Sequence, residues 1–79
     1  MKKIIVTLYF SCFESYKICA QLLYIIEKTF EISEDEKGIV FDENGGISVN
    51  YVIDSSNEVI LRDIVQHTPI GKFCKFTIY

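Results

Sequence analysis

The side chains best suited to chemistry in this sequence are three cysteines and a single histidine. Cys12 stands at the expected start of a helix, where the helix dipole can lower the pKa of a thiol and make it nucleophilic. No base that could activate the thiol stands near Cys12 in the sequence, and a free cysteine is usually a small buried hydrophobic residue. His67 lacks a cysteine or a pair of acids at the spacing of metal ligands. We therefore expect a non-enzymatic protein with no catalytic residue, metal site or cofactor.

Acidic residues are the clearest chemical feature of the chain, whose formal net charge is −3. Ten of the eleven acids lie between residues 27 and 63, while both ends of the chain are mildly basic. Because phosphate contacts need clustered lysine and arginine, direct binding of nucleic acid is not expected. An acidic surface instead attracts a basic or nucleic-acid-binding protein, although charge runs also serve solubility alone. The residues expected to contact such a partner are Glu31, Glu34, Asp35, Glu36, Asp42 and Glu43.

The apolar pattern predicts the elements that position these residues. Residues 3–10 and 47–53 alternate with the period of a strand, a short apolar run at 39–41 precedes the second of them, and 72–79 alternate as a last strand. Residues 12–31 repeat apolar positions with the period of a helix, and Ser11 with Glu14 has capping-box spacing. The segment 33–38 is predicted to be a solvated turn.

The turn near Asn44–Gly46 decides how two of the strands pair. A two-residue loop would place Phe41 beside Ser48, whereas a three-residue loop with a left-handed glycine places it opposite Val49 and Ile39 opposite Tyr51. The second register buries more apolar surface, so we expect it.

Residues 55–68 are ambiguous between a helix and a strand. As a helix they place Leu61 and Val65 on one side, and Ser55 with Glu58 supplies a second capping-box spacing. As a strand they alternate poorly, although their β-branched residues favour that form. The helix is the preferred interpretation.

The resulting order β-α-β-β-α-β predicts one α+β domain over residues 1–79 in the ferredoxin-like arrangement. This split βαβ fold has a four-stranded antiparallel sheet with both helices on one face. If residues 55–68 formed a strand, one helix would instead pack on a five-stranded antiparallel sheet.

Several activities known on this arrangement need residues that the chain lacks. Metal chaperones carry Cys-x-x-Cys in the first strand–helix loop, where residues 11–13 hold one thiol. Acylphosphatases need an arginine in that loop, and the only arginine is Arg62. RNA-recognition motifs stack bases on aromatic residues of the third strand, where this chain has Ser48, Asn50 and Val52.

The sheet face without helices is the second candidate surface. By alternation it is apolar and aromatic, which is typical of an interface. It fits either a homodimer, with two sheets packed face to face, or a foreign protein partner. Its candidate residues are Ile5, Tyr9, Phe73, Lys75 and Tyr79, and Tyr24 on the polar side of the first helix is a lesser candidate.

Three cysteines, an odd number, argue against a disulfide framework, so we expect a cytoplasmic protein. No stretch approaches the ~20 apolar residues of a membrane span, and no membrane partner is expected. In size, acidity and lack of a site, the chain resembles phage-encoded inhibitors of host defence such as anti-CRISPR proteins. That resemblance implies a small inhibitor that covers a basic surface of its target. The alternative is a dimeric ferredoxin-like domain that binds a small regulatory ligand.

Overall fold

Residues 2–68 and 70–79 are described by the structure, which is a computed structural model. Its strands form one antiparallel sheet in the order β2-β3-β1-β4, which confirms the ferredoxin-like arrangement. Residues 58–66 are helical, so the five-stranded alternative is wrong. In chain order the elements are β1 (Lys3–Phe10), α1 (Phe13–Thr29), the 3₁₀ helix η1 (Glu34–Glu36), β2 (Lys37–Phe41), β3 (Ile47–Asp54), the 3₁₀ helix η2 (Ser55–Asn57), α2 (Glu58–Gln66), α3 (Ile70–Phe73) and β4 (Cys74–Ile78).

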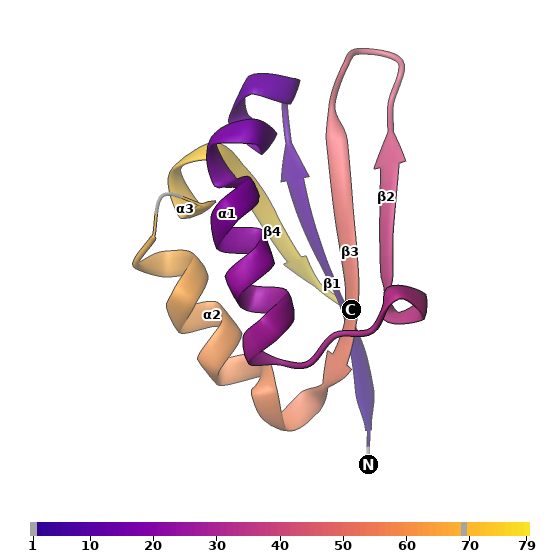
Figure 1. The fold of residues 1–79 in the computed structure, drawn as a ribbon, viewed down its shortest axis with the longest axis vertical. Helices are drawn as coiled ribbons and strands as arrows, with labels where there is room; N and C mark the ends of the chain where they lie inside the picture. The colour runs from indigo at the N-terminus through magenta and orange to yellow at the C-terminus, as the bar shows by residue number, and fades with distance from the viewer. Residues whose placement is uncertain (1, 69) are drawn as a thin grey trace.

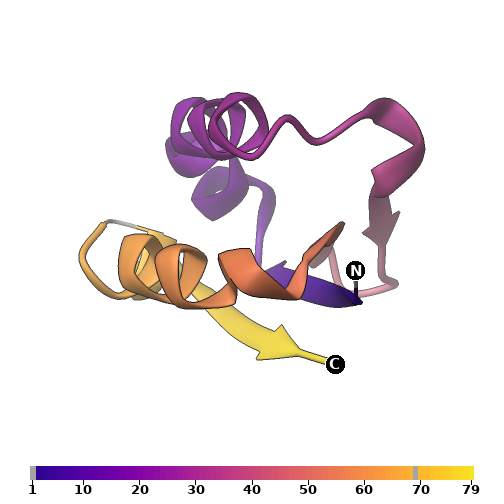
Figure 2. The same cartoon turned by 90° about the horizontal axis from the view of Figure 1, so that it is seen from below.

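The two longer helices, α1 and α2, cover the same face of the sheet (Figures 1 and 2). Alternate residues of β3 from Ile47 to Ile53 are buried against them, as the period-2 pattern predicts. Cys19, Leu23 and Ile26 of α1 complete this core with Leu61 and Val65 of α2. The edge strand β2 lies farthest from α2, at the right-hand side of Figure 1.

The hairpin between β2 and β3 has a different register from the predicted one. Phe41 lies opposite Ile47 rather than Val49, and Ile39 lies opposite Val49 rather than Tyr51. The loop has three residues as predicted, but these are 43–45 instead of 44–46. Its glycine, Gly45, has the left-handed φ of 85°.

Asp42 is the reason for this shift. Its Oδ1 accepts hydrogen bonds from the backbone N–H of Asn44 at 2.9 Å and of Gly46 at 2.7 Å. Such an Asx turn begins the reversal of the chain at the aspartate. Because the shift is two residues, each side chain still lies on its predicted face of the sheet.

Neither predicted capping box forms at the two longer helices. α1 begins at Phe13, with Cys12 as an extended N-cap that makes no side-chain cap hydrogen bond. Ser11 is therefore one residue too early to cap the helix. Ser55 lies inside η2, whose own cap is Asp54, with an Oδ1 that accepts from the Ser56 N–H at 3.2 Å.

The last strand and the first helix are shorter than predicted. β4 begins at Cys74, because Lys72 and Phe73 belong to the short helix α3. Cys74 packs against the core with Phe76 and Ile78, as the alternation predicts. α1 ends at Thr29 instead of residue 31, and Glu31 reverses the chain with a left-handed φ of 52°.

Candidate functional site

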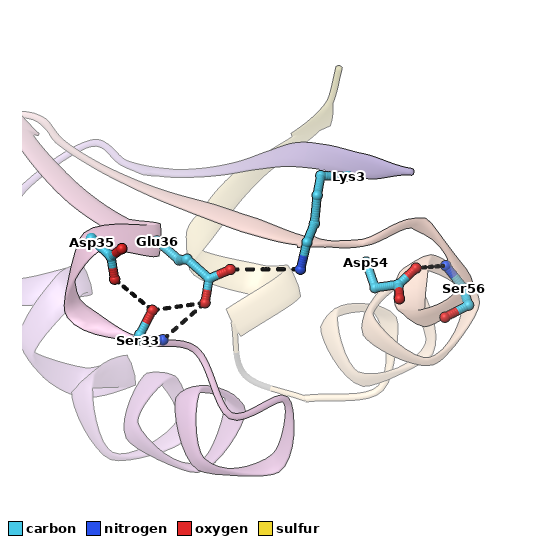
Figure 3. Close-up of polar contacts among 6 residues, drawn as sticks. All are labelled: Lys3, Ser33, Asp35, Glu36, Asp54 and Ser56. Atoms are coloured by element: carbon cyan, nitrogen blue, oxygen red, sulfur yellow. Dashed lines mark hydrogen bonds and ion pairs between the residues drawn. The ribbon is translucent and has the colours of Figure 1, made fainter. Parts of the chain in front are cut away.

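The predicted acidic residues lie before and after β2: just past α1 and within η1 on one side, and in the hairpin on the other. Figure 3 shows how Asp35 and Glu36 of the first group are held. The Ser33 hydroxyl lies 2.6 Å from Asp35 Oδ1 and 2.8 Å from Glu36 Oε1, and the Ser33 N–H donates to the same Glu36 oxygen. This is a true capping box on η1, and it fixes two of the predicted partner-binding acids.

Glu36 also joins η1 to the central strand. Its Oε2 lies 3.6 Å from the Lys3 ammonium of β1 (Figure 3). The hydrogen bonds from Ser33 lower the pKa of both Asp35 and Glu36, so these side chains stay charged under mildly acidic conditions. Their charge contributes to the surface field, but both Glu36 oxygens and Asp35 Oδ1 already have partners.

Asp42, at the other end of β2, is also held by hydrogen bonds within the domain. Besides the two backbone N–H groups, its carboxylate accepts a hydrogen bond from the Tyr9 hydroxyl at 2.9 Å. These contacts lower the pKa of Asp42, the bond from Gly46 most of all, and raise the pKa of Tyr9. The hairpin is thereby tied to the open face of β1.

Acid is expected to weaken the fold through this carboxylate. The pKa of Asp42 is lower in the folded chain than the ordinary value of 3.8. Such a group stabilises the fold above its unfolded pKa, and that stabilisation is lost as the pH falls through the folded pKa. The thermal midpoint should therefore fall below about pH 4, and Asp42→Asn should flatten this dependence because it keeps an oxygen acceptor without the charge.

Circular dichroism melts between neutral pH and about pH 2 measure this effect. Glu14→Gln, at an exposed carboxylate of α1, is the matched control and should change the pH dependence less than Asp42→Asn does. Parallel curves for the wild type and Asp42→Asn would contradict the role assigned to Asp42.

The other three predicted acids remain available for a partner. Glu31, Glu34 and Glu43 are exposed, and their side chains make no hydrogen bond or ion pair with the residues that the structure describes. They lie just past α1, at the start of η1 and in the hairpin loop respectively. Sequence alone does not separate these carboxylates from the three that serve local structure, because both sets occur in the same short runs.

The open sheet face is uncovered, and its composition is more polar than predicted. At its centre the Thr7 hydroxyl donates to Asn50 Oδ1 at 2.7 Å across the β1–β3 pair. Apolar side chains occupy one end, where Ile5 is 47% and Tyr79 77% exposed. A polar centre is unlike the apolar core of a stable homodimer interface.

Tyr9, Phe73 and Lys75 meet at the opposite end of the open face. With Ser11, Lys72 and Cys74 they line a shallow hollow of about 210 Å³. Phe73 belongs to α3 rather than to the last strand, so its predicted assignment to that strand is wrong, although it lies beside Tyr9 and Lys75 of the open face. Tyr24 lies apart from the open sheet face and lines a hollow together with Glu31, with the Lys28 ammonium 5.6 Å from its ring centroid.

A partly buried polar cluster behind β2 was not predicted from the sequence. The Tyr51 hydroxyl donates to Glu27 Oε2 at 2.6 Å, and the Lys37 ammonium lies 3.0 Å from the same carboxylate. Burial, with the hydrogen bond to Glu27, raises the pKa of Tyr51 far above its ordinary value. The available signal was Tyr51 itself, because a buried tyrosine hydroxyl needs a hydrogen-bond partner.

Cys12 is exposed at the start of α1, and a hydrogen bond with Ser15 at 3.3 Å lowers its pKa. Burial instead raises the pKa of Cys74 to about 12. His67 Nε2 lies 3.3 Å from Asp63 Oδ1 in an exposed pair on α2. Among the described residues no group of three or more histidine, cysteine or acidic side chains gathers at metal-binding distance.

None of the described helices combines the length and apolar character needed to cross a lipid bilayer. The principal surface features are the carboxylates near the two ends of the edge strand β2 and the uncovered sheet face.

Comparison with protein-family models, curated proteins and solved structures finds no significant match to this chain.

Proposed function

We propose that this protein is a non-enzymatic binding module that occupies a basic surface of a larger protein. The observation that carries the proposal is that negatively charged side chains lie near both ends of β2. Glu34 and Glu43 stand near its two ends with no partner among the described residues. Between them, on the face of β2 that also bears the helices, Ile39 and Phe41 are 39% and 70% exposed, so apolar side chains separate the two charges.

Fixed geometry supports a binding role more than a solubilising one. Asp35, Glu36 and Asp42 are held by hydrogen bonds, so the charges beside Glu34 and Glu43 do not have to be ordered when a partner arrives. Preorganised charge lowers the entropy cost of association and raises the rate of encounter with a basic surface.

A module that covers a basic surface competes with any nucleic acid bound there, because both ligands need the same lysine and arginine side chains. Inhibition of a nucleic-acid-binding protein is therefore the specific activity that we propose. A phage-encoded anti-defence protein of the anti-CRISPR kind, acting in the cytoplasm, would work in this way.

The proposal predicts that partner capture depends on Glu34 and Glu43. The protein and the double variant Glu34→Gln/Glu43→Gln are immobilised and exposed to nuclease-treated bacterial lysate. Basic proteins retained by the wild type should bind about three- to tenfold more weakly to the variant, since exposed charge contacts each contribute up to about 1 kcal/mol. Added double-stranded DNA should displace these basic proteins from the immobilised wild type, because it binds the same lysine and arginine side chains.

Glu14→Gln/Asp63→Asn is the matched control, because it removes the same charge from α1 and α2, away from β2. Equal capture by both double variants, or a captured set that is not basic, would contradict the proposal. Light scattering on the isolated protein is the second measurement. A stable dimer that buries the open sheet face would favour the alternative of a dimeric ligand-binding domain.

A further inference from the structure

The outer edge of β2 has unpaired backbone groups. The Asp42 N–H donates to the Gly46 carbonyl at 3.0 Å, so that pair is hydrogen-bonded across the hairpin. Hydrogen-bonded and non-bonded pairs alternate along an antiparallel ladder, so Val40 and Gly38 point their backbone groups at β3. The N–H and C=O groups of Ile39 and Phe41 therefore point outward, where no other described strand pairs with them.

Two features that usually block pairing with another chain, a proline and a bulge, are absent from this edge. Natural edge strands are guarded by proline, by a bulge or by a lysine that projects from the edge. β2 contains no proline, and it pairs with β3 in continuous register. Its only lysine, Lys37, is turned inward to the Glu27 carboxylate at 3.0 Å.

A hollow also lies where η1 meets the edge. It encloses about 300 Å³ and is lined by Glu34, Lys37, Gly38 and Ile39. A Cβ atom at Gly38 would have no heavy atom within 4 Å, so nothing within the domain requires glycine there. Glycine inside a strand often marks a place where another backbone or ligand approaches closely.

The acidic residues near β2 determine which kind of chain can pair with this edge. A second copy pairing antiparallel about Ile39 would place residues 35 and 36 opposite residues 43 and 42 of its partner, so that acid meets acid at both ends. The opposite edge of the sheet, β4, has Lys72 and Lys75 beside it, and these would repel a basic segment. A basic extended segment fits β2 alone.

We propose that β2 binds an extended segment of the partner as a fifth strand, with basic residues at both ends of an apolar stretch. This inference deepens the proposed function and rests on it. The outward groups of Ile39 and Phe41 hydrogen-bond the added strand, and a basic side chain enters the hollow beside Glu34. Residues 36 and 42, which bracket the strand, span about 20 Å, so the partner's basic residues should be about six positions apart.

A displayed library of random ten-residue peptides, selected on the folded protein, tests this inference. The expected peptides alternate apolar residues between two basic ends. Binding should slow hydrogen exchange of the Ile39 and Phe41 amides, which the β2–β3 ladder leaves unbonded, by at least about tenfold. Protection confined to other residues would overturn the inference.

Ile39→Pro is the decisive variant, since it removes an outward N–H that the monomer does not use, and edge strands tolerate proline at such positions. It should weaken the selected peptides at least about tenfold, whereas Ile39→Val, which keeps the N–H, should bind like the wild type. If Ile39→Pro unfolds, hydrogen exchange of the Ile39 and Phe41 amides in the wild type still tests whether the peptide adds as a strand.

The outcomes separate this inference from the proposed function. Basic peptides that need Glu34 and Glu43 but neither protect these amides nor respond to Ile39→Pro would overturn strand addition and leave the binding role intact. Selection without enrichment of basic peptides would overturn both. Self-association of the protein that Ile39→Pro abolishes would show a second copy at the edge and would also overturn the inference.

Discussion

Replacing Glu27 with alanine is expected to lower the free energy of unfolding by about 2 kcal/mol, within a range of about 1–3 kcal/mol. Tyr51 is fully buried, and its hydroxyl donates to Glu27 at 2.6 Å. Removing the carboxylate leaves that hydroxyl without an acceptor and leaves Lys37 without its ion pair. For a domain of this size each kcal/mol lowers the thermal midpoint by about 4–8 °C.

Urea denaturation of Glu27→Ala beside Glu14→Ala measures this effect. Both variants remove an acid from α1, but Glu14 is exposed near the helix start and contributes only about 0.3–1 kcal/mol through the helix dipole. Tyr51→Phe supplies the third comparison, because it removes the buried donor instead of its acceptor. Equal losses for Glu27→Ala and Glu14→Ala would show that the cluster does not stabilise the fold.

Two glycine substitutions are expected to change stability in opposite directions. Gly46→Ala should destabilise the fold by about 1–3 kcal/mol, the usual cost of overpacking. An added Cβ atom would lie 2.5 Å from Asp42 Oδ2 and 2.8 Å from Tyr9 Cε1. Gly38→Ala should instead stabilise it by about 0.4–1 kcal/mol, because its Cβ meets open space and alanine restricts the unfolded chain.

Thermal melts of both variants test this pair. The double variant Tyr9→Ala/Gly46→Ala provides the control for Gly46, since removing the tyrosine ring makes room for the new methyl group. The effect of Gly46→Ala measured in the Tyr9→Ala background should therefore be smaller than in the wild type. Equal stability of Gly46→Ala and Gly38→Ala would contradict the close packing of Tyr9 on the hairpin.

The strands and helices could be predicted from the sequence wherever one face is buried. The alternation of residues 47–53 identifies β3, because every second residue of that stretch lies in the core. Residues 58–66 form a helix despite their β-branched content, since a helix buries Leu61 and Val65 together. Burial of one face outweighs intrinsic propensity in both segments.

The hairpin register and the helix starts could not be predicted, because each depends on a few polar contacts. Asp42 belongs equally well to an acidic patch and to an Asx turn, and only the folded hairpin shows that its oxygens serve the turn. Ser11 and Ser55 have the correct spacing from a glutamate, but the helices do not begin directly after them. Such local choices differ by about 1 kcal/mol or less, which a pattern of residue types does not resolve.

The candidate site was predictable in part. The sequence identifies acids before and after β2, and the strand between them follows from the apolar run at 39–41. Which carboxylates are unbonded depends on the local turn geometry around Ser33 and Asp42, and on Tyr9, which lies 33 residues from Asp42 in the sequence. The bare edge of β2 depends on the order of strands in the sheet and on the ion pair that turns Lys37 inward.

The central position of β1 in the sheet has a kinetic consequence. Its two neighbours are β3 and β4, so the pair Val6 and Ile78 joins residues from almost opposite ends of the chain. Domains dominated by such distant contacts fold more slowly than helical bundles of equal stability, because a long loop must close before any pairing energy is gained. During synthesis β1 emerges before both β3 and β4, so its pairing is complete only after β4 has followed it.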